Sequence, residues 1–315
     1  MPMHILLSLP ESESSPWMEL FRAALPEATC ERHEPDSAPA GSARRADYVV
    51  AAYPSATLFA AQPAPKAIFT VSAGVGHVLR LPNLPRAVPL VRVEDAGMAA
   101  QMIRYVLTAA MRFVQRLDTY RRQQQAGQWQ QHRPRAPAQI AAGVMGLGVI
   151  GSAIARALVQ QGFRVRGHAR SAKAVDGVRC YAGGQEFDAF LRGLDFVCSV
   201  LPSTPETVGL LQRRTLTLLA DGAHVVNIGR GNLLVEDDLL ALLDSGKLSG
   251  ATLDVFREEP LPSTHPFWRR PEITVTPHVA GLTIPDETVG QVADKIRALE
   301  RGLPVTGIVD YARGY

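Results

Sequence analysis

The stretch Gly146-Leu147-Gly148-Val149-Ile150-Gly151 lies near the middle of the chain and matches the pattern G-x-G-x-x-G. An apolar run, Ile140–Met145, precedes it, and a segment with helical character, Ser152–Gln160, follows it. In this context the pattern predicts a strand, a tight turn and a helix. The first glycine permits the turn, the second lets a pyrophosphate approach the backbone, and the third lets the helix pack closely on the sheet. Amides at the helix N-terminus attract phosphate groups, so we expect this stretch to bind a dinucleotide.

The segments after this turn continue the alternation of strands and helices. We predict strands at Phe163–His168, Asp195–Leu201, Ala223–Ile228, Gly250–Phe256 and Ile273–Thr276, and helices at Phe187–Leu191 and Val235–Asp244. Such alternation is typical of a parallel sheet with helices on both faces. Because strands are predicted on both sides of the glycine pattern, we favour the dinucleotide site over a packing turn without a ligand.

The N-terminal part of the chain shows a second alternation of this kind. It predicts strands at His4–Leu9, Asp47–Tyr53, Ala67–Ser72 and Val88–Val93, and a helix at Trp17–Leu25. A long helical pattern runs from Met98 to Leu117 and is expected to pack on a core and to end in a charged, Gln-rich tail around Arg121–Gln125. Gln128–Ala138 is expected to form a loop or connecting arm. The last predicted helix, Pro285–Arg301, is expected to return to the N-terminal domain.

Composition excludes several classes of protein. The chain has 315 residues, 46% hydrophobic and 20% charged, as in a globular protein of one or two domains. The net charge of +3 does not indicate a nucleic-acid partner. Cys30, Cys180 and Cys198 lack metal-ligand spacing and indicate reduced thiols in a cytoplasmic protein, and no metal site is expected. We expect no signal peptide, and the uncharged segment Ala136–Ala155 suits a strand–turn–helix better than a membrane span.

The end of the second strand after the glycine pattern indicates the type of cofactor. An NAD site usually carries a carboxylate about 20 residues after the glycines. Here Arg170 stands 19 residues after Gly151, and no carboxylate appears before Asp176. Arginine can pair with a 2′-phosphate through two hydrogen bonds, and Lys173 adds a second positive charge. This favours NADP(H), with NAD(H) possible; the alternative is a solvated basic turn.

Three charged or titratable residues follow three other strand ends, where ligands bind in open α/β sheets. They are Arg230, Glu259 and His278. Reduction of a 2-oxo acid needs a cation for the carboxylate, a proton donor for the carbonyl oxygen and a hydride. Arg230 can clamp the carboxylate, His278 can deliver the proton, and Glu259 can orient the imidazole. A nicotinamide supplies the hydride.

Each of these residues also has a purely structural alternative. Arg230 stands between glycines and can be a turn residue, His278 can be an ordinary loop histidine, and Glu259 can be a surface acid. Their occurrence together with the glycine pattern favours the site. In the N-terminal domain, the amides of Val75 and Gly76 follow a strand and can hold the substrate carboxylate opposite Arg230, although a plain tight turn is equally compatible with the sequence.

These residues and the segments around them resemble the D-2-hydroxyacid dehydrogenase family, above all its glyoxylate/hydroxypyruvate reductase A branch. The segments that carry the resemblance are SAGVGH (72–77), RVEDAGMAAQM (92–102), GVMGLGVIGS (143–152), LPSTPETVG (201–209), NIGRG (227–231), VEDDLLALLDSGKLSGATLDVFREEPLP (235–262), TPHVAG (276–281) and ARGY (312–315). The resemblance extends over nearly the whole chain.

The resemblance implies an α/β fold of two Rossmann-like domains with parallel sheets and an active site between them. A nucleotide-binding domain, residues 97–283, is expected to be inserted in a discontinuous flavodoxin-like substrate domain, residues 1–96 and 284–315. The family also implies a homodimer, held by the helix near residues 98–122 and the arm that follows. Trp129 of that arm is a candidate to reach the partner's active site.

The resemblance gives roles to individual residues as well. It implies Arg230 as the substrate clamp, His278 as the acid/base, Glu259 as its partner and Asp254 as a neighbour of the nicotinamide amide. The substrate is expected to meet Gly74, Val75, Gly76, Arg230 and His278, with Tyr53 and Met98 in the pocket wall. The cofactor is expected to meet Gly146, Gly148, Val149, Ile150, Gly151, Arg170, Ser171, Lys173, Leu201, Pro202, Thr207, Ile228, Gly229, Arg230, Asp254, His278 and Gly281.

The sequence departs from the family in places that bear on specificity. Gly76 stands where relatives often have aspartate, and Ala172 replaces a basic residue of the 2′-phosphate turn. The leading hypothesis is NADPH-dependent reduction of glyoxylate to glycolate and of hydroxypyruvate to glycerate. One alternative is a bulkier substrate such as phenylpyruvate. Another, of a different class, is an NAD(P)-sensing protein that resembles a corepressor.

Overall fold

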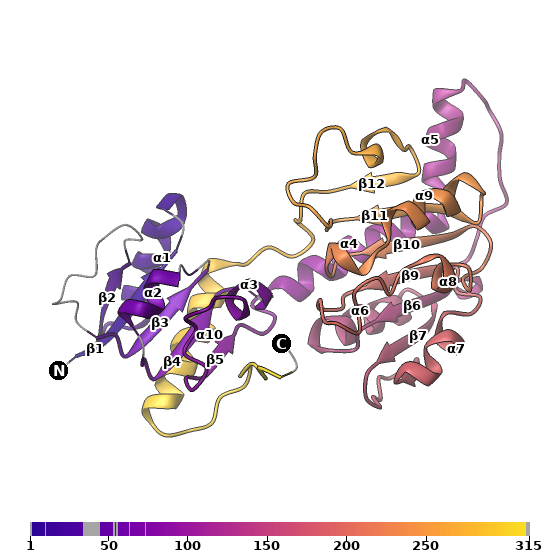
Figure 1. Cartoon of the computed structure of the whole chain (residues 1–315). Helices are drawn as coiled ribbons and strands as arrows, with labels where there is room; N and C mark the ends of the chain where they lie inside the picture. The colour runs from indigo at the N-terminus through magenta and orange to yellow at the C-terminus, as the bar shows by residue number, and fades with distance from the viewer. Residues whose placement is uncertain are drawn as a thin grey trace. The chain divides into compact units, whose positions relative to one another are not determined.

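The computed structural model describes residues 2–9, 11–33, 45–52, 54, 56–62, 64–72 and 74–312. The chain divides into two compact units, one of Met1–Gly97 with Thr283–Tyr315 and one of Met98–Leu282 (Figure 1). The first unit is therefore built from both ends of the sequence. The second unit is one continuous segment.

The first unit contains a parallel sheet of five strands in the order β2-β1-β3-β4-β5. The strands are β1 Met3–Ser8, β2 Ala28–Arg32, β3 Tyr48–Ala51, β4 Ala67–Thr70 and β5 Leu90–Arg92. This order is that of flavodoxin-like folds, as predicted. The edge strand β2 was not predicted, because its short run Ala-Thr-Cys-Glu-Arg is only partly buried and lacks an apolar pattern.

Helices cover both faces of this sheet. They are α1 Glu11–Ala24, α2 Ala56–Ala61, α3 Gly76–Leu79 and α10 Pro285–Glu300. Apolar side chains of α2 and α3 pack with one face of the strands, and α1 packs beside α10. The hydroxyl of Tyr48 in β3 donates to Glu300 of α10 across 2.7 Å. The C-terminal helix thus belongs to the core of the N-terminal unit, and α1 begins well before the predicted Trp17.

The second unit contains a parallel sheet of seven strands in the order β12-β11-β10-β9-β6-β7-β8. The strands are β6 Ala141–Met145, β7 Arg164–Ala169, β8 Val178–Ala182, β9 Phe196–Ser199, β10 Ala223–Asn227, β11 Leu248–Leu253 and β12 Ile273–Val275. From β8 to β11 this is the doubly wound dinucleotide-binding order, which reverses direction between β6 and β9. The edge strand β8 was not predicted. The predicted Rossmann-type fold with parallel sheets is confirmed.

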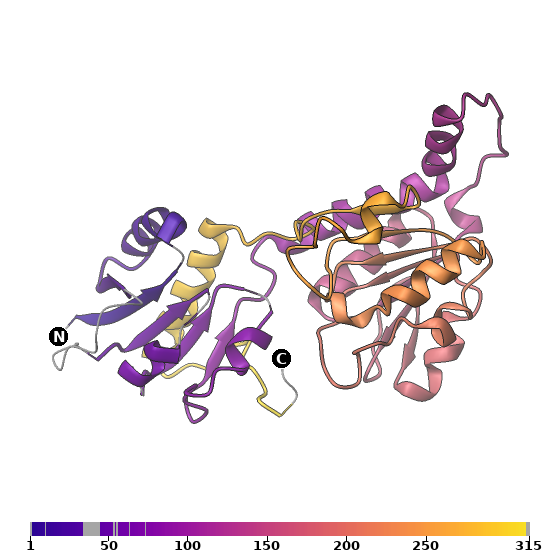
Figure 2. The same ribbon diagram turned by 45° about the horizontal axis from the view of Figure 1, so that its top comes forward.

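Helices lie on both faces of the larger sheet (Figures 1 and 2). They are α4 Met98–Val114, α5 Leu117–Gln125, α6 Val149–Gln160, α7 Phe187–Leu191, α8 Arg213–Leu216 and α9 Glu236–Asp244. α4 and α6 pack together on one face, and α7, α8 and α9 share a core with the other. The single helix predicted from Met98 to the tail around Arg121–Gln125 is in fact two helices, because Arg116 adopts a left-handed φ of +56° and turns the chain from α4 into α5.

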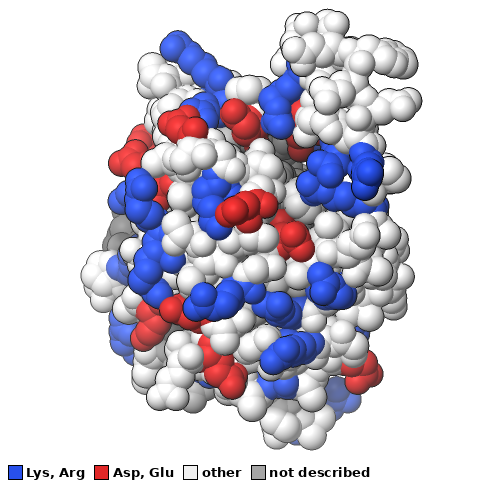
Figure 3. Space-filling model, turned by 90° about the vertical axis from the view of Figure 1, so that its right-hand side faces the viewer, with Lys and Arg blue, Asp and Glu red and all other residues white. Residues whose placement is uncertain are grey.

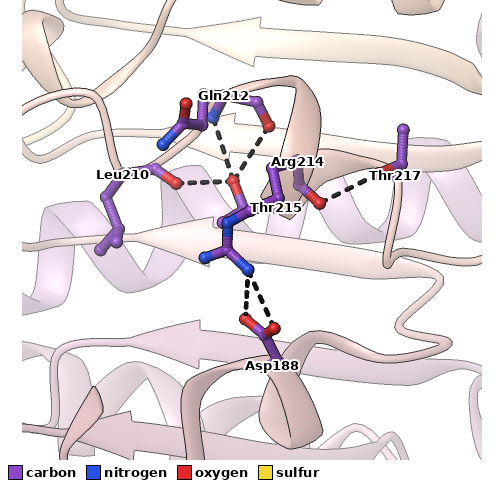
Figure 4. Close-up of polar contacts among 6 residues, drawn as sticks. All are labelled: Asp188, Leu210, Gln212, Arg214, Thr215 and Thr217. Atoms are coloured by element: carbon purple, nitrogen blue, oxygen red, sulfur yellow. Dashed lines mark hydrogen bonds and ion pairs between the residues drawn. The ribbon is translucent and has the colours of Figure 1, made fainter. Parts of the chain in front are cut away.

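The short helix α8 is held by its own polar groups (Figure 4). The Thr215 hydroxyl donates to the carbonyl oxygen of Leu210 at 2.6 Å and accepts from the Gln212 amide at 3.0 Å. Arg214 reaches both carboxylate oxygens of Asp188 in α7 at 2.9 Å. Because this ion pair is exposed, we expect it to contribute only about 0–1 kcal/mol to the free energy of unfolding. Its main effect is to fix the orientation of α8 relative to α7.

Within the described part of the chain, every helix is too short or too polar to span a bilayer. The uncharged segment Ala136–Ala155 contains a 3₁₀ turn at Pro137–Gln139, the strand β6 and the first half of α6. It is the strand–turn–helix that the sequence predicted.

Candidate active site

The glycine-rich turn joins β6 to α6 at the carboxyl end of the strand. Gly146 has a φ of +99°, which residues with a Cβ rarely adopt. A Cβ on Gly151 would lie 1.7 Å from the carbonyl oxygen of Gly146. Only glycine at these two positions therefore lets α6 begin so close to β6.

The middle glycine of the turn has a different reason to be there. Gly148 precedes α6 in an extended conformation, and a Cβ built on it would meet no heavy atom within 4 Å. The space beside it is open, and the first residues of α6, Val149 and Ile150, follow at once; Val149 is 61% exposed. Open space at a helix N-terminus is what a pyrophosphate needs. The turn therefore fits the phosphates of a dinucleotide.

The basic turn after β7 is exposed. Arg170, Ser171 and Lys173 all present their side chains to solvent. The pKa of Glu206 lies below its usual value because of hydrogen bonds from Thr204 and from its own backbone, and the charge of Arg170 adds to that effect. The charge of Arg170 therefore acts on the loop that follows β9, which contains Glu206.

That loop is held by its own threonines. The Thr207 hydroxyl donates to the carbonyl oxygen of Pro202 at 2.7 Å and accepts from the Thr204 amide at 2.8 Å. The side chain of Leu201 lies 3.1 Å from where a Cβ of Gly146 would stand. In this structure Thr207 shapes the loop, and Leu201 packs beside the glycine turn.

The loop after β10 presents Arg230 at the end of the strand. The buried Asn227 side chain accepts from the Gly229 amide at 3.2 Å and donates to the Arg230 carbonyl at 2.9 Å. A Cβ on Gly229 would lie 2.6 Å from the carbonyl oxygen of Leu201, and one on Gly231 would lie 1.9 Å from the backbone of Phe256. The two glycines let this loop sit between its neighbours, and Asn227 fixes the backbone of Arg230.

The two residues predicted as an acid/base pair do meet. The Nδ1 atom of His278 lies 2.8 Å from Oε2 of Glu259, and the side chains are 49% and 36% exposed. The other oxygen, Oε1, accepts from the Phe256 amide at 2.8 Å. Because a carboxylate accepts, Nδ1 donates and Nε2 is the ring nitrogen left to act on a ligand. Since Phe256 also contacts the loop of Arg230, all three residues belong to one edge of the sheet.

Asp254 underlies the His278 loop. It is only 1% exposed, and its carboxylate accepts from the Thr276 hydroxyl at 2.5 Å and from the amides of Val279 and Ala280 at 2.8 and 2.9 Å. His278 itself has a left-handed φ of +55°, and its amide donates to the Asp254 carbonyl at 2.9 Å. Asp254 therefore holds the histidine in an unusual backbone conformation.

A second hydroxyl extends this network to α4. Tyr105 bonds to the Thr276 hydroxyl at 2.6 Å. Burial, together with the nearby Asp254 and Cys198, raises the pKa of Tyr105 to about 12, so the phenol stays protonated at neutral pH. Sequence reasoning missed Tyr105, which it assigned to core packing, and gave no role to Thr276 or Asn227. Asn227 and Thr276 stand at strand ends beside the motifs of Arg230 and His278, and that position could have signalled them, whereas no sequence pattern signals Tyr105.

The predicted substrate residues of the first unit follow β4. Gly74 is partly exposed, Val75 is buried and Gly76 begins α3 at the surface. The Ser72 hydroxyl donates to the Gly74 carbonyl at 2.9 Å and so shapes the turn. Tyr53 lies outside the described residues. Met98, the first residue of α4, is 4% exposed and lies close to Gly281, where an added Cβ would be 3.5 Å from the Met98 Cβ.

Among the described residues, no group of three His, Cys, Asp or Glu side chains could hold a metal ion. The arm after α5 has no regular structure over residues 128–136, and its Trp129 is 96% exposed.

The chain is similar to known proteins over nearly its whole length. The model of the family "D-isomer specific 2-hydroxyacid dehydrogenase, NAD binding domain" matches residues 107–280. A curated relative from Serratia proteamaculans, named glyoxylate/hydroxypyruvate reductase A, is 40% identical over 99% of this chain and 100% of its own. The relative of the same name from Yersinia enterocolitica is 39% identical over the same shares.

Two solved structures are similar over their full length. One is a D-isomer specific 2-hydroxyacid dehydrogenase from Xanthobacter autotrophicus in complex with NADPH and MES, with a TM-score of 0.93 and 35% identity over 100% of both chains. The other is an NADPH-dependent glyoxylate/hydroxypyruvate reductase from Sinorhizobium meliloti in complex with NADP and sulfate. Its TM-score is 0.88, with 34% identity over 99% of this chain and 100% of that one.

Proposed function

Because this chain belongs to the D-isomer specific 2-hydroxyacid dehydrogenase family, we propose that it reduces glyoxylate to glycolate and hydroxypyruvate to glycerate with NADPH. The observation that carries the proposal is the 2.8 Å contact between His278 and Glu259 at the sheet edge that also holds Arg230 and the glycine-rich turn. The names of the full-length relatives support the substrates, and the NADP-bound relatives support the cofactor.

His278 acts as the proton donor. Glu259 holds Nδ1, which directs Nε2 toward the substrate and stabilises the imidazolium that must form before the transfer. Proton delivery to the carbonyl oxygen then leaves the ring neutral, still bonded to Glu259. Asp254 keeps the backbone of His278 in place and is a positioning residue.

Arg230 clamps the substrate carboxylate. Its half-buried guanidinium already donates to the Gly229 carbonyl at 2.6 Å, so part of its fork is fixed before a ligand arrives. A bidentate pair with the carboxylate orients the adjacent carbonyl group. The amides of Val75 and Gly76 would support the same carboxylate from the first unit.

The glycine-rich turn binds the pyrophosphate of the cofactor, which supplies a hydride when bound. Gly148 leaves room beside the amides of α6, and Arg170 with Lys173 recognises the 2′-phosphate of NADP(H). NAD(H) lacks that phosphate and is expected to bind more weakly.

The working form is a homodimer in the cytoplasm. The exposed Trp129 of the arm and the half-exposed Leu117 at the start of α5 support association through this part of the second unit. The described cysteines, Cys30, Cys180 and Cys198, are free thiols, which suits a reducing compartment. Light scattering on the purified protein tests the dimer, and a monomer at micromolar concentration would refute it.

The function is tested by initial rates of NADPH and NADH oxidation, each with glyoxylate, hydroxypyruvate, pyruvate and phenylpyruvate. Faster NADPH oxidation with the first two supports the proposal. A preference for phenylpyruvate keeps the mechanism but changes the substrate. Tight NADPH binding without turnover on any of the four contradicts an enzyme and favours a nucleotide-sensing protein.

A further inference from the structure

A chain of three hydrogen-bonded side chains leads from α4 to the loop that carries His278. The Tyr105 hydroxyl lies 2.6 Å from the Thr276 hydroxyl, which lies 2.5 Å from Oδ1 of Asp254. Tyr105 and Thr276 are partly buried, and Asp254 is fully buried. All three belong to the second unit. The proposed mechanism gives a role to Asp254 alone, and the first two members of the chain have none.

The direction of each proton in this chain follows from the groups involved. A carboxylate can only accept, so the single hydroxyl proton of Thr276 goes to Asp254. The Thr276 oxygen can then only accept from Tyr105, and the phenol is the donor. Because burial raises the pKa of Tyr105 to about 12, this donor keeps its proton at neutral and mildly alkaline pH.

Asp254 depends on hydrogen-bond donors rather than on a basic partner. Figure 3 shows many basic side chains on the side where α5 and the arm lie, yet no described lysine, arginine or histidine forms an ion pair with Asp254. Its carboxylate accepts from the Thr276 hydroxyl and from the amides of Val279 and Ala280. A buried charge without a counterion is stabilised only by such bonds, and hydrogen bonds in series strengthen one another. Tyr105 therefore strengthens the bond from Thr276 to Asp254.

Asp254 also sets the backbone that carries His278. Three consecutive amides, those of His278, Val279 and Ala280, donate to Asp254, the first to its carbonyl oxygen and the other two to its carboxylate. The left-handed φ of +55° at His278 persists only where the surroundings hold it. A rotation of the carboxylate would release two of these amides, and with them the ring that now lies 2.8 Å from Glu259.

We propose that Tyr105 is a positioning residue for proton transfer by His278. Its phenol donates to Thr276 and so fixes the rotamer of Asp254. Asp254 in turn holds Nδ1 of His278 against Glu259. The inference rests on the proposed function, which makes His278 the proton donor. Tyr105 acts through the two side chains that follow it and gives no proton to the substrate.

The first test is Tyr105→Phe, which removes one oxygen and keeps the ring. We expect kcat with glyoxylate and NADPH to fall about threefold to tenfold, the usual weight of one hydrogen bond, while KM for NADPH stays close to the wild-type value. Thr276→Val should lower kcat at least as far, and Thr276→Ser, which keeps the hydroxyl, should lower it less. Tyr48→Phe is the matched control, because it removes a hydroxyl bonded to Glu300 at 2.7 Å in the first unit and should leave kcat unchanged.

A double variant separates positioning from a general loss of stability. If Tyr105 acts only through His278, adding Tyr105→Phe to His278→Asn should not lower the residual rate further. A full additional loss in the double variant would mean that Tyr105 acts by another route, and would overturn the proposal. Melting temperatures of all variants show that each is folded at the assay temperature.

The ring nitrogens of His278 give a second measurement that needs no turnover. In protein with isotopically labelled histidine, nitrogen–proton correlation spectra of the ring show which nitrogen carries the proton. The His278 signals are those absent from His278→Asn. At a pH where the ring is neutral, we expect the proton on Nδ1 in the wild type and in Tyr48→Phe, because Glu259 accepts there. In Tyr105→Phe we expect a mixture of both tautomers.

The outcomes distinguish this inference from the proposed function. A wild type that turns over none of the four oxo acids would refute the function, and a mixture of tautomers confined to Tyr105→Phe would still support the positioning. Wild-type kcat and an unchanged tautomer in Tyr105→Phe would overturn the inference and leave the function standing. A lower kcat with an unchanged tautomer would also overturn it, because the effect would not pass through the contact with Glu259.

Discussion

At the scale of single residues, the proposed proton donor His278 offers the most direct test of the mechanism. Replacing it with asparagine should lower kcat by about 10²–10⁴, the usual loss when a general acid is removed. Asparagine is the right substitution because it tolerates the left-handed φ of +55° at this position. Steady-state kinetics with glyoxylate measure the loss, and Glu259→Gln should show a smaller one. Turnover close to normal in His278→Asn would remove the residue from the mechanism.

Arg170 is the residue proposed to set the preference between the two cofactors. Arg170→Asp should reverse the NADPH preference, because a carboxylate repels the 2′-phosphate and can bond a free ribose hydroxyl. Each tenfold change in the ratio of kcat/KM values for NADPH and NADH corresponds to about 1.4 kcal/mol. Lys173→Ala serves as the milder companion. An undiminished NADPH preference would mean that the phosphate is held elsewhere.

Element by element, the glycine-rich turn offers a matched pair of variants. Gly148→Ala should fold with nearly unchanged stability, since its Cβ enters open space, but should bind NADPH more weakly. Gly151→Ala should unfold at lower temperature, because its Cβ would overlap the Gly146 carbonyl oxygen. Thermal melts and NADPH titrations measured together separate the effects. Equal loss of stability in both would contradict the separate roles given to the two glycines.

The helices and strands also differ in how well the sequence predicts them. Strands with strong apolar runs, such as β6 and β10, were predictable from those runs. The site residues at their ends were predictable because ligands in these sheets bind beyond the strand ends. The edge strands β2 and β8 were not, because half-exposed edges need no apolar alternation. The left-handed Arg116 that separates α4 from α5, and the hydrogen bonds from Tyr105 through Thr276 to Asp254, depend on tertiary contacts that no local pattern records.

For the molecule as a whole, acid stability should depend on His224. Burial lowers its pKa to about 4, with Asp118 opposing and Arg112 assisting. As the pH falls below 6.5, His224 takes up a proton in the unfolded chain. In the folded chain it stays neutral until about pH 4. Folding is therefore weakened across this range, by about 3 kcal/mol when complete.

The check is urea unfolding of the wild type and His224→Phe at pH 7 and pH 4.5. Phenylalanine preserves the stacking on Phe196 and cannot take up a proton. The free energy of unfolding should fall more steeply toward acid in the wild type, since carboxylates titrate in both proteins. Parallel pH profiles would show that His224 is not responsible.

The first unit takes its last helix, α10, and the segment of Val309 from the far end of the chain. The ribosome therefore completes synthesis of the second unit before it reaches α10, which the first unit needs to finish folding. At about 5–20 residues per second, the inserted segment alone takes on the order of 10–40 s to synthesise. During that time, strands β1 to β5 of the nascent chain lack α10, which in the folded protein covers one face of their sheet. A truncation that removes α10 should therefore destabilise the N-terminal unit more than the second unit, although the second unit lies closer to the cut in sequence.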